Sequence, residues 1–338
     1  MRRRDFISLI GSAAVVWPVA ARSQASRKRP LIGRLSVGSR DTPLVAKYIN
    51  LFPSGMRELG YVEGQDFDMA YGMADFHSDR FPQVVAEMVR LAPDVILVGA
   101  TVDAVAAAKA TATIPIVVGS LADPVELGLI KSHARPGGNV TGIMPYVAGL
   151  PTKQLELARE LVPGATRIGL LDDVTDPKAL PQSREIKAAG EKLEINIIPA
   201  EVSTAADIGQ AYETFSTGGA EIVVVEQSTM LLFARQVIAE AAAAKKLPTL
   251  YGYHEHVEAG GLVSYGVNLD WCYVRTAYYV DKILCRSSFR RRSSCGSIKR
   301  PPKRLVSKSR LLCSSGPTRS SNKCRVKRSA SLPKELAR

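Results

Sequence analysis

Short, unbroken apolar runs alternate with helical patterns along most of this chain. Residues 95–98 read Val-Ile-Leu-Val, and residues 114–118 read Ile-Pro-Ile-Val-Val. An apolar run without alternating polar residues indicates a strand that is buried on both faces, as in a parallel sheet covered by helices. The sequence therefore predicts an α/β fold built on doubly wound parallel sheets.

This alternation occurs twice. The first set comprises strands at 31–37, 67–71, 95–99 and 114–118 with helices at 43–59, 81–91 and 103–112. The pattern restarts after residue 139, with helices at 152–161, 181–193, 205–215 and 231–244 and strands at 167–171, 195–199 and 221–225. Since single cores rarely grow beyond about 250 to 300 residues, we predict two Rossmann-like lobes joined by a hinge. Lobe 1 comprises residues 30–145 plus 258–284 and lobe 2 residues 146–257, with crossings at 121–146 and 260–266.

The amino terminus has the three-part layout of a cleaved export signal. Three arginines precede the apolar stretch Phe6–Ala21, and small residues surround Ala25. The stretch is interrupted by Pro18 and is too short for a membrane span, which needs about 20 apolar residues. The run Arg3–Ile7 also resembles the twin-arginine export motif. We expect residues 1–25 to direct export to the periplasm and to be cleaved near Ala25.

The formal net charge of +13 lies at the two ends of the chain. Residues 285–338 hold 17 Lys and Arg against one acid, and residues 1–25 hold four Arg against one acid. The body between them has 24 basic and 30 acidic residues, so we expect no nucleic-acid partner. A nucleic-acid-binding or membrane-binding role for the basic tail stays open as an alternative, and salt-sensitive binding that is lost on deleting residues 285–338 would support it.

Cysteine and histidine spacing gives no reason to expect a metal or another cofactor. Four of the five cysteines lie in residues 285–338, with spacings that match no zinc pattern. Cys272 is interpreted as a buried small apolar residue. On a strand, His254 and His256 would face the same side and could hold a metal with one further ligand. The favoured interpretation is that both are solvated on a loop at the rim of the cleft between the two lobes.

Polar residues follow the predicted strands at their carboxyl ends, where open parallel sheets bind ligands. Helix N–H groups near Ser36–Ser39 and Thr101–Asp103 would suit a ligand carboxylate, while Asp123 or Asp172 could meet an ammonium group. Alternatively, Thr101, Asp103 and Ser228 cap helices. Tyr146, Tyr253 and Tyr265 are candidate stacking residues. The predicted ligand-binding residues are Ser36, Ser39, Ala100, Thr101, Ser120, Asp123, Tyr146, Asp172, Gln227, Ser228 and Tyr253.

Several segments together resemble one family. They are residues 114–125, the run Ala-Arg-Pro-Gly-Gly-Asn-Val-Thr-Gly at 134–142, the run Glu-Ala-Gly-Gly-Leu-Val-Ser-Tyr-Gly at 258–266, and residues 279–284. Over residues 30–284 the chain resembles the ABC-transporter substrate-binding proteins related to tryptophan and tyrosine binders, which have the type 1 periplasmic-binding-protein architecture.

The resemblance implies the extracytoplasmic solute-binding component of an importer. Such a protein, expected as a monomer, captures a small amino-acid-like or aromatic ligand between its lobes. It delivers the ligand to a membrane permease that is powered by a separate ATPase. No catalytic residue is expected, because the body lacks a nucleophile elbow, a P-loop and a dinucleotide fingerprint. The alternative is an exported α/β enzyme of the isomerase or lyase type that acts on a small carboxylate.

The chain departs from this family after Leu284, where relatives continue with a Gly-Pro linker, a strand and a helix. Residues 285–338 are instead rich in Arg, Ser and Cys. Codons for residues 316–323 can be chosen so that reading two bases later gives Ala-Asp-Glu-Val-Ile-Glu-stop, an ending typical of relatives. We hypothesise a frameshifted translation from about residue 285, which the nucleotide sequence tests. A natural disordered basic tail is the alternative.

Overall fold

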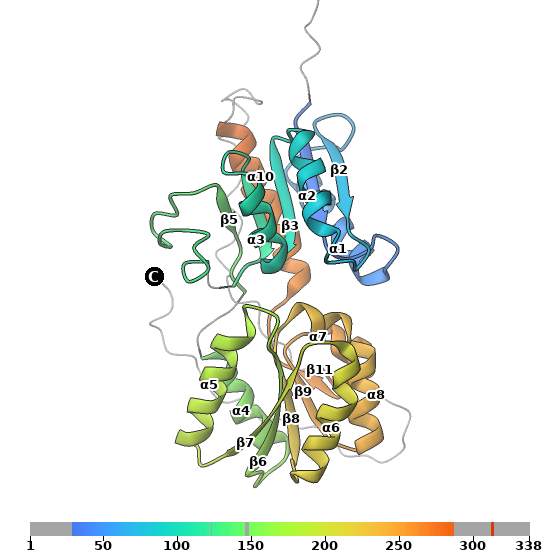
Figure 1. Ribbon diagram of the computed structural model, residues 1–338, viewed down its shortest axis with the longest axis vertical. Coiled ribbons are helices and arrows are strands. Elements are labelled where there is room, and N and C mark those ends of the chain that lie inside the picture. The colour runs from blue at the N-terminus through green and yellow to red at the C-terminus, as the bar shows by residue number, and fades with distance from the viewer. Residues whose placement is uncertain (1–28, 123, 146–148, 287–311, 314–338) are drawn as a thin grey trace, which may run out of the picture.

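The computed structural model describes residues 29–122, 124–145, 149–286 and 312–313 (Figure 1). They form two lobes, each built on a sheet with helices on both faces, that lie end to end along the longest axis of the molecule. Two parallel-sheet α/β lobes are what the apolar runs predict. Asp123, Tyr146, the export signal and nearly all of the predicted tail lie outside the described residues.

The sheet of the first lobe has five parallel strands in the order β2-β1-β3-β4-β5. The central strands β3 and β4 are buried at every position, which confirms the interpretation of their unbroken apolar runs. Alternate residues of β3 pack on opposite faces, Leu97 beside Phe52 of α1 and Val98 beside Val85 of α2. The strands are β1 (Leu31–Ser36), β2 (Asp68–Met73), β3 (Val95–Ala100), β4 (Ile116–Ser120) and β5 (Val140–Gly142), and the helices are α1 (Pro43–Glu58), α2 (Phe81–Arg90) and α3 (Thr101–Ala110).

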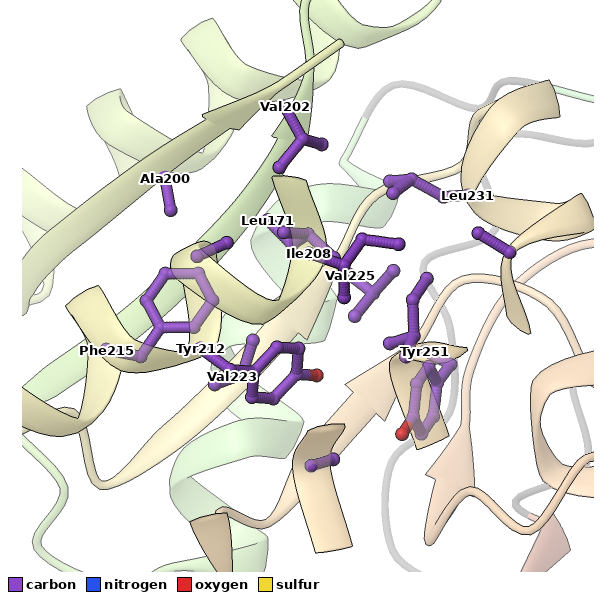
Figure 2. Close-up of a cluster of buried hydrophobic side chains, with 14 of the residues drawn as sticks. Leu171, Ala200, Val202, Ile208, Tyr212, Phe215, Val223, Val225, Leu231 and Tyr251 are labelled. Atoms are coloured by element: carbon purple, nitrogen blue, oxygen red, sulfur yellow. The ribbon is translucent and has the colours of Figure 1, made fainter. Parts of the chain in front are cut away.

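The sheet of the second lobe has five parallel strands in the order β10-β9-β8-β6-β7, with a short antiparallel strand β11 beside β10. Tyr212 and Phe215 of α6 pack on Val223 and Val225 of β8 (Figure 2). The strands are β6 (Arg167–Asp173), β7 (Asn196–Val202), β8 (Ile222–Val225), β9 (Thr249–Tyr251), β10 (Val263–Ser264) and β11 (Leu312–Cys313). The helices are α4 (Leu150–Leu161), α5 (Ala179–Lys192), η1 (Ala205–Asp207), α6 (Ile208–Thr217), α7 (Thr229–Phe233), α8 (Arg235–Lys245) and α9 (Glu255–Glu258).

The second lobe extends beyond the predicted boundary at residue 257, although the chain leaves it within the predicted crossing at 260–266. The prediction places residues from 258 onward in the first lobe, but β10 pairs in parallel with β9, so the chain leaves the second sheet only after Ser264. Gly260, with φ of +102°, turns the chain back so that buried Val263 can extend the sheet. Helix α10 (Leu269–Arg286) then packs on α1 and β4 of the first lobe.

One further sequence prediction can be compared with the described residues. Cys272 is a buried free cysteine on α10, as interpreted from its position in the body of the chain. Within the described ranges, no helix combines the length and the apolar character needed to cross a membrane.

Candidate ligand site between the lobes

A cavity of about 50 Å³ lies where the two lobes meet. Strands β1, β3 and β4 end beside it, and helix α7 lies at the end of the second lobe that faces the first lobe (Figure 1). This volume accommodates a few water molecules, so a larger ligand enters only if the lobes move apart. The lining residues are Arg34, Ser36, Val45, Tyr48, Gly99, Ala100, Asp103 and Ser120 of the first lobe, Lys178, Ser228, Thr229, Leu232, Phe233 and Tyr253 of the second, and Leu269 and Tyr273.

The structure brings part of the predicted residue set together. Ser36, Ala100, Ser120, Ser228 and Tyr253 line the cavity, whereas Ser39, Thr101, Asp172 and Gln227 do not. Ligand contact by the first five stays a prediction.

Several polar groups of this set act within the fold. Thr101 Oγ1 donates to the Ser120 carbonyl at 3.2 Å and accepts the Ala122 N–H at 2.9 Å. Ser228 Oγ accepts the Leu231 N–H at 3.0 Å and so caps α7. Gln227 Nε2 donates to the Gly252 carbonyl at 2.9 Å. The helix-capping interpretation is therefore confirmed for Ser228.

Asp172 lies at the end of β6, away from the cavity lining. Its Oδ2 accepts a hydrogen bond from Ser183 Oγ at 2.7 Å, and its closest ammonium group, that of Lys187, is 4.0 Å away. Its carboxylate thus packs against α5, and contact with a ligand ammonium group stays a prediction that this arrangement does not favour.

Arg34 is a cavity residue that sequence reasoning missed. It lies on β1 and is 4% exposed, and its guanidinium carbon is 5.4 Å from the ring centroid of Tyr273. Neither Nε nor Nη1 has a hydrogen-bond partner among the described residues. The available signal was one charged residue inside the otherwise apolar strand Leu-Ile-Gly-Arg-Leu-Ser.

Asp103 also lines the cavity, from the first turn of α3. Its two carboxylate oxygens accept backbone N–H groups of Val37 and Ala100, each at 3.3 Å. Burial raises the pKa of Asp103 to about 6, although these N–H groups and the charge of Arg34 favour its ionised form. The capping role that was left open is therefore confirmed for Asp103.

Lys178 supplies a second buried cation, from the opposite lobe. It is 6% exposed, its ammonium group is 3.7 Å from Asp176, and it donates to Tyr253 Oη at 3.4 Å. Burial disfavours the charged form, but Asp176 and Tyr253 more than offset this effect and raise its pKa above the usual value. Lys178 is therefore protonated at neutral pH.

Aromatic rings form much of the cavity wall. Tyr48 of α1 stacks on Tyr273 of α10, with ring centroids 4.3 Å apart and an interplanar angle of 13°. Phe233 of α7 contacts Phe76 of the first lobe edge to face, at 5.2 Å. Tyr253 joins Tyr48 and Tyr273 in one buried apolar cluster that spans both lobes.

The two histidines occupy different environments, so the interpretation of both as solvated is wrong. His256 is buried in helix α9, with its ring stacked on Tyr251 and its Nε2 3.2 Å from the Leu231 carbonyl. Within the described residues, a different group, His254 with Glu255 and Asp270, could hold a metal ion. The ammonium group of Lys47 lies 2.9 Å from Asp270 and already supplies a counter-charge there.

Comparisons with known proteins agree with this geometry. The family described as ABC transporter substrate binding protein matches residues 43–287. A tyrosine-binding protein from Clostridioides difficile (strain R20291) is 26% identical over 219 residues, which cover 65% of this chain and 63% of that protein. The chain thus spans less than two thirds of this curated relative.

Two solved structures show the same fold. A conserved domain protein from Vibrio cholerae has a TM-score of 0.70 and 26% identity, covering 76% of this chain and 85% of its own. An ABC domain in complex with L-Trp from Streptococcus pneumonia has a TM-score of 0.70 and 22% identity over the same shares of the two chains. The family match spans most of both lobes and the helix that connects back to the first, and the chain therefore belongs to the ABC transporter substrate-binding proteins.

Proposed function

We propose that this protein is the extracytoplasmic solute-binding component of an ABC importer and captures an aromatic, amino-acid-like ligand in the interlobe cavity. The observation that supports this most is the aromatic wall contributed by both lobes, from Tyr48 and Tyr273 on one side and Phe233 and Tyr253 on the other. Aromatic rings bind a planar ligand by offset stacking and edge-to-face contacts. A ligand held by both lobes favours their closed arrangement.

The lining chemistry favours binding over catalysis. The hydroxyl of Ser228 caps a helix, and the carboxylate of Asp103 accepts backbone N–H groups. Neither is paired with a base or nucleophile in the way that acyl transfer or proton abstraction requires. An isomerase or lyase remains an outcome of the test.

The names of similar proteins support the ligand class. One relative is a tyrosine-binding protein, and one solved neighbour holds L-Trp. Membership of the family supports delivery of the ligand to a membrane permease that works with a separate ATPase. Export by residues 1–25 fits this role and is tested by replacing both Arg3 and Arg4 with Lys, which should keep the protein in the cytoplasm.

The test is a thermal-shift and calorimetric screen of the full chain against L-Trp, L-Tyr and L-Phe, with L-Leu and myo-inositol as comparisons. A ligand at a hundredfold excess over its Kd stabilises the native state by about 2.7 kcal/mol. Phe233→Ala should weaken binding, whereas Val237→Ala, at an exposed position of the neighbouring helix α8, should not. Absence of binding to every aromatic ligand, or chemical turnover detected by mass spectrometry, would refute the proposal.

Delivery is tested in cells. Deleting the gene should abolish uptake of the radiolabelled ligand at concentrations near its Kd, and the intact gene should restore it. Unchanged uptake would show that the protein does not supply an importer.

A further inference from the structure

The guanidinium group of Arg34 is buried at the cavity and forms no ion pair among the described residues, although its charge favours the ionised form of Asp103. It is 4% exposed, and no carboxylate of the described residues lies within ion-pair distance, 4.0 Å, of it. Its Nε and Nη1 atoms have no hydrogen-bond partner among the described residues. Burying a charged group whose N–H donors lack acceptors is unfavourable, so an anionic acceptor in the cavity would stabilise this guanidinium.

A second unsatisfied group belongs to another residue that lines the cavity. Ser120 ends β4, and its Oγ is buried without a hydrogen-bond partner among the described residues. Arg34 and Ser120 both line the cavity. A guanidinium and a hydroxyl together match the acceptor oxygens of a carboxylate.

The lining offers much less to a ligand ammonium group. Asp103 is the one carboxylate among the described lining residues, and its oxygens are already used by the N–H groups of Val37 and Ala100. Lys178, which is protonated and lies 3.7 Å from Asp176, lines the opposite side and offers no acceptor to a ligand ammonium group.

We propose that Arg34, assisted by Ser120, recognises the carboxylate of the ligand, and that the cavity takes aromatic carboxylates whether or not they carry an amino group. This inference rests on the proposed function and narrows its ligand class. It predicts different affinities for three otherwise similar molecules: an aromatic amino acid, its deaminated acid and its decarboxylated amine.

Calorimetry of the full chain with L-tyrosine, 3-(4-hydroxyphenyl)propionate and tyramine tests this selectivity. We expect the acid to bind within about threefold of the amino acid, and tyramine to bind about a hundredfold more weakly or worse, because it cannot pair with the guanidinium. Tyramine that binds as tightly as the acid overturns the role of the carboxylate. If the acid binds more than about tenfold more weakly than tyrosine, the claim that binding does not need the amino group is overturned.

The matched variant is Arg34→Met, which keeps an unbranched side chain and removes the charge. It should weaken binding of the acid by about thirtyfold or more and abolish the preference over tyramine, while the ligand-free protein melts no lower than the wild type. Arg90→Met, on the exposed last turn of α2, should change neither property. Tight binding of the acid by Arg34→Met overturns the inference.

A further probe separates the two proposals. If none of the three tyrosine-like molecules binds the wild type, the proposed function fails for this ligand class, and benzoate at millimolar concentration then decides the role of Arg34. A thermal shift with benzoate in the wild type that is lost in Arg34→Met supports the carboxylate site. No shift in either protein overturns it.

Discussion

The phenol of Tyr48 donates a hydrogen bond of 2.6 Å to Oε1 of Glu255, joining helix α1 of the first lobe to helix α9 of the second. Both side chains are buried, and the carboxylate of Glu255 is 0% exposed. Burial and the charge of Glu255 raise the pKa of Tyr48 well above its usual value, so the phenol stays protonated. Because the two residues belong to different lobes, this bond exists only while the lobes touch.

Tyr48→Phe should therefore weaken ligand binding by weakening closure. A hydrogen bond to a charged group contributes about 1.5–3 kcal/mol, so we expect Kd to rise by roughly tenfold to a hundredfold. The stacking of this ring on Tyr273 is retained by Phe. Calorimetric titration of an aromatic ligand measures the effect.

The matched control is Tyr71→Phe, which removes a phenol hydroxyl from β2, outside the cavity lining. Its Kd should equal that of the wild type. An unchanged Kd in Tyr48→Phe would show that the bond to Glu255 contributes nothing to closure.

A contact of this kind is beyond the reach of sequence reasoning. Unbroken apolar runs predict β3 and β4 because burial on both faces is a local property of each strand. Tyr48 and Glu255 are separated by 207 residues, and neither position has a local pattern that specifies the other. Arg34 interrupts an apolar strand visibly, but only the structure shows that its guanidinium lies at the cavity without a partner.

Glu226 is a buried carboxyl group that should lower stability at neutral pH. It is 0% exposed, and no N–H or O–H donor among the described residues reaches its oxygens. Burial, and then the charge of Asp172, raise its pKa well above 4.5. The folded protein thus holds this proton more tightly than the unfolded chain, and stability falls as pH rises above about 4.5 through the raised pKa.

Glu226→Gln should therefore stabilise the protein increasingly with pH. We expect little change in the free energy of unfolding at pH 4 and a gain of about 1–3 kcal/mol at pH 8, measured by urea denaturation. Glu240→Gln, at an exposed position of α8, should show no such trend. A gain that is constant from pH 4 to pH 8 would contradict the assignment.

His256 has the opposite pH dependence. Burial lowers its pKa from 6.5 to about 4, so the unfolded chain takes up a proton first as the solution is acidified. The stability that depends on neutral His256 is complete above pH 6.5 and is lost as pH falls toward 4, by up to about 3 kcal/mol.

His256→Phe keeps a ring against Tyr251 and removes the titration. Relative to wild type, the variant should be less stable at pH 7, because it lacks the bond to the Leu231 carbonyl, and should lose less stability between pH 6.5 and pH 4. Exposed His77→Gln is the control, and its pH profile should follow the wild type. Parallel profiles for His256→Phe and wild type would refute the prediction.

The boundary of the second lobe and the two histidines show why other sequence predictions were wrong. Strand β10 has two residues, too few for periodicity to assign it to a sheet, and its pairing with β9 decides its lobe. The triplet His-Glu-His gives no local sign that His256 packs between Tyr251 and Tyr253, with its ring stacked on both. Both outcomes depend on tertiary contacts formed by residues that lie near each other in sequence but belong to different elements.

Gly266 ends the run 258–266 in the return to the first lobe, and its surroundings leave no room for a side chain. A Cβ there would collide with the Gly252 carbonyl oxygen and would lie 2.7 Å from Gln227 Nε2, which itself bonds that oxygen. Since backbone must shift to admit a methyl group, Gly266→Ala should destabilise the protein by about 2–4 kcal/mol in urea denaturation. Gly209→Ala, on α6 with nothing within 4 Å of the added Cβ, should instead stabilise it by about 0.5–1 kcal/mol. Equal effects of the two substitutions would mean that helix propensity, and not this close backbone approach, decides the cost.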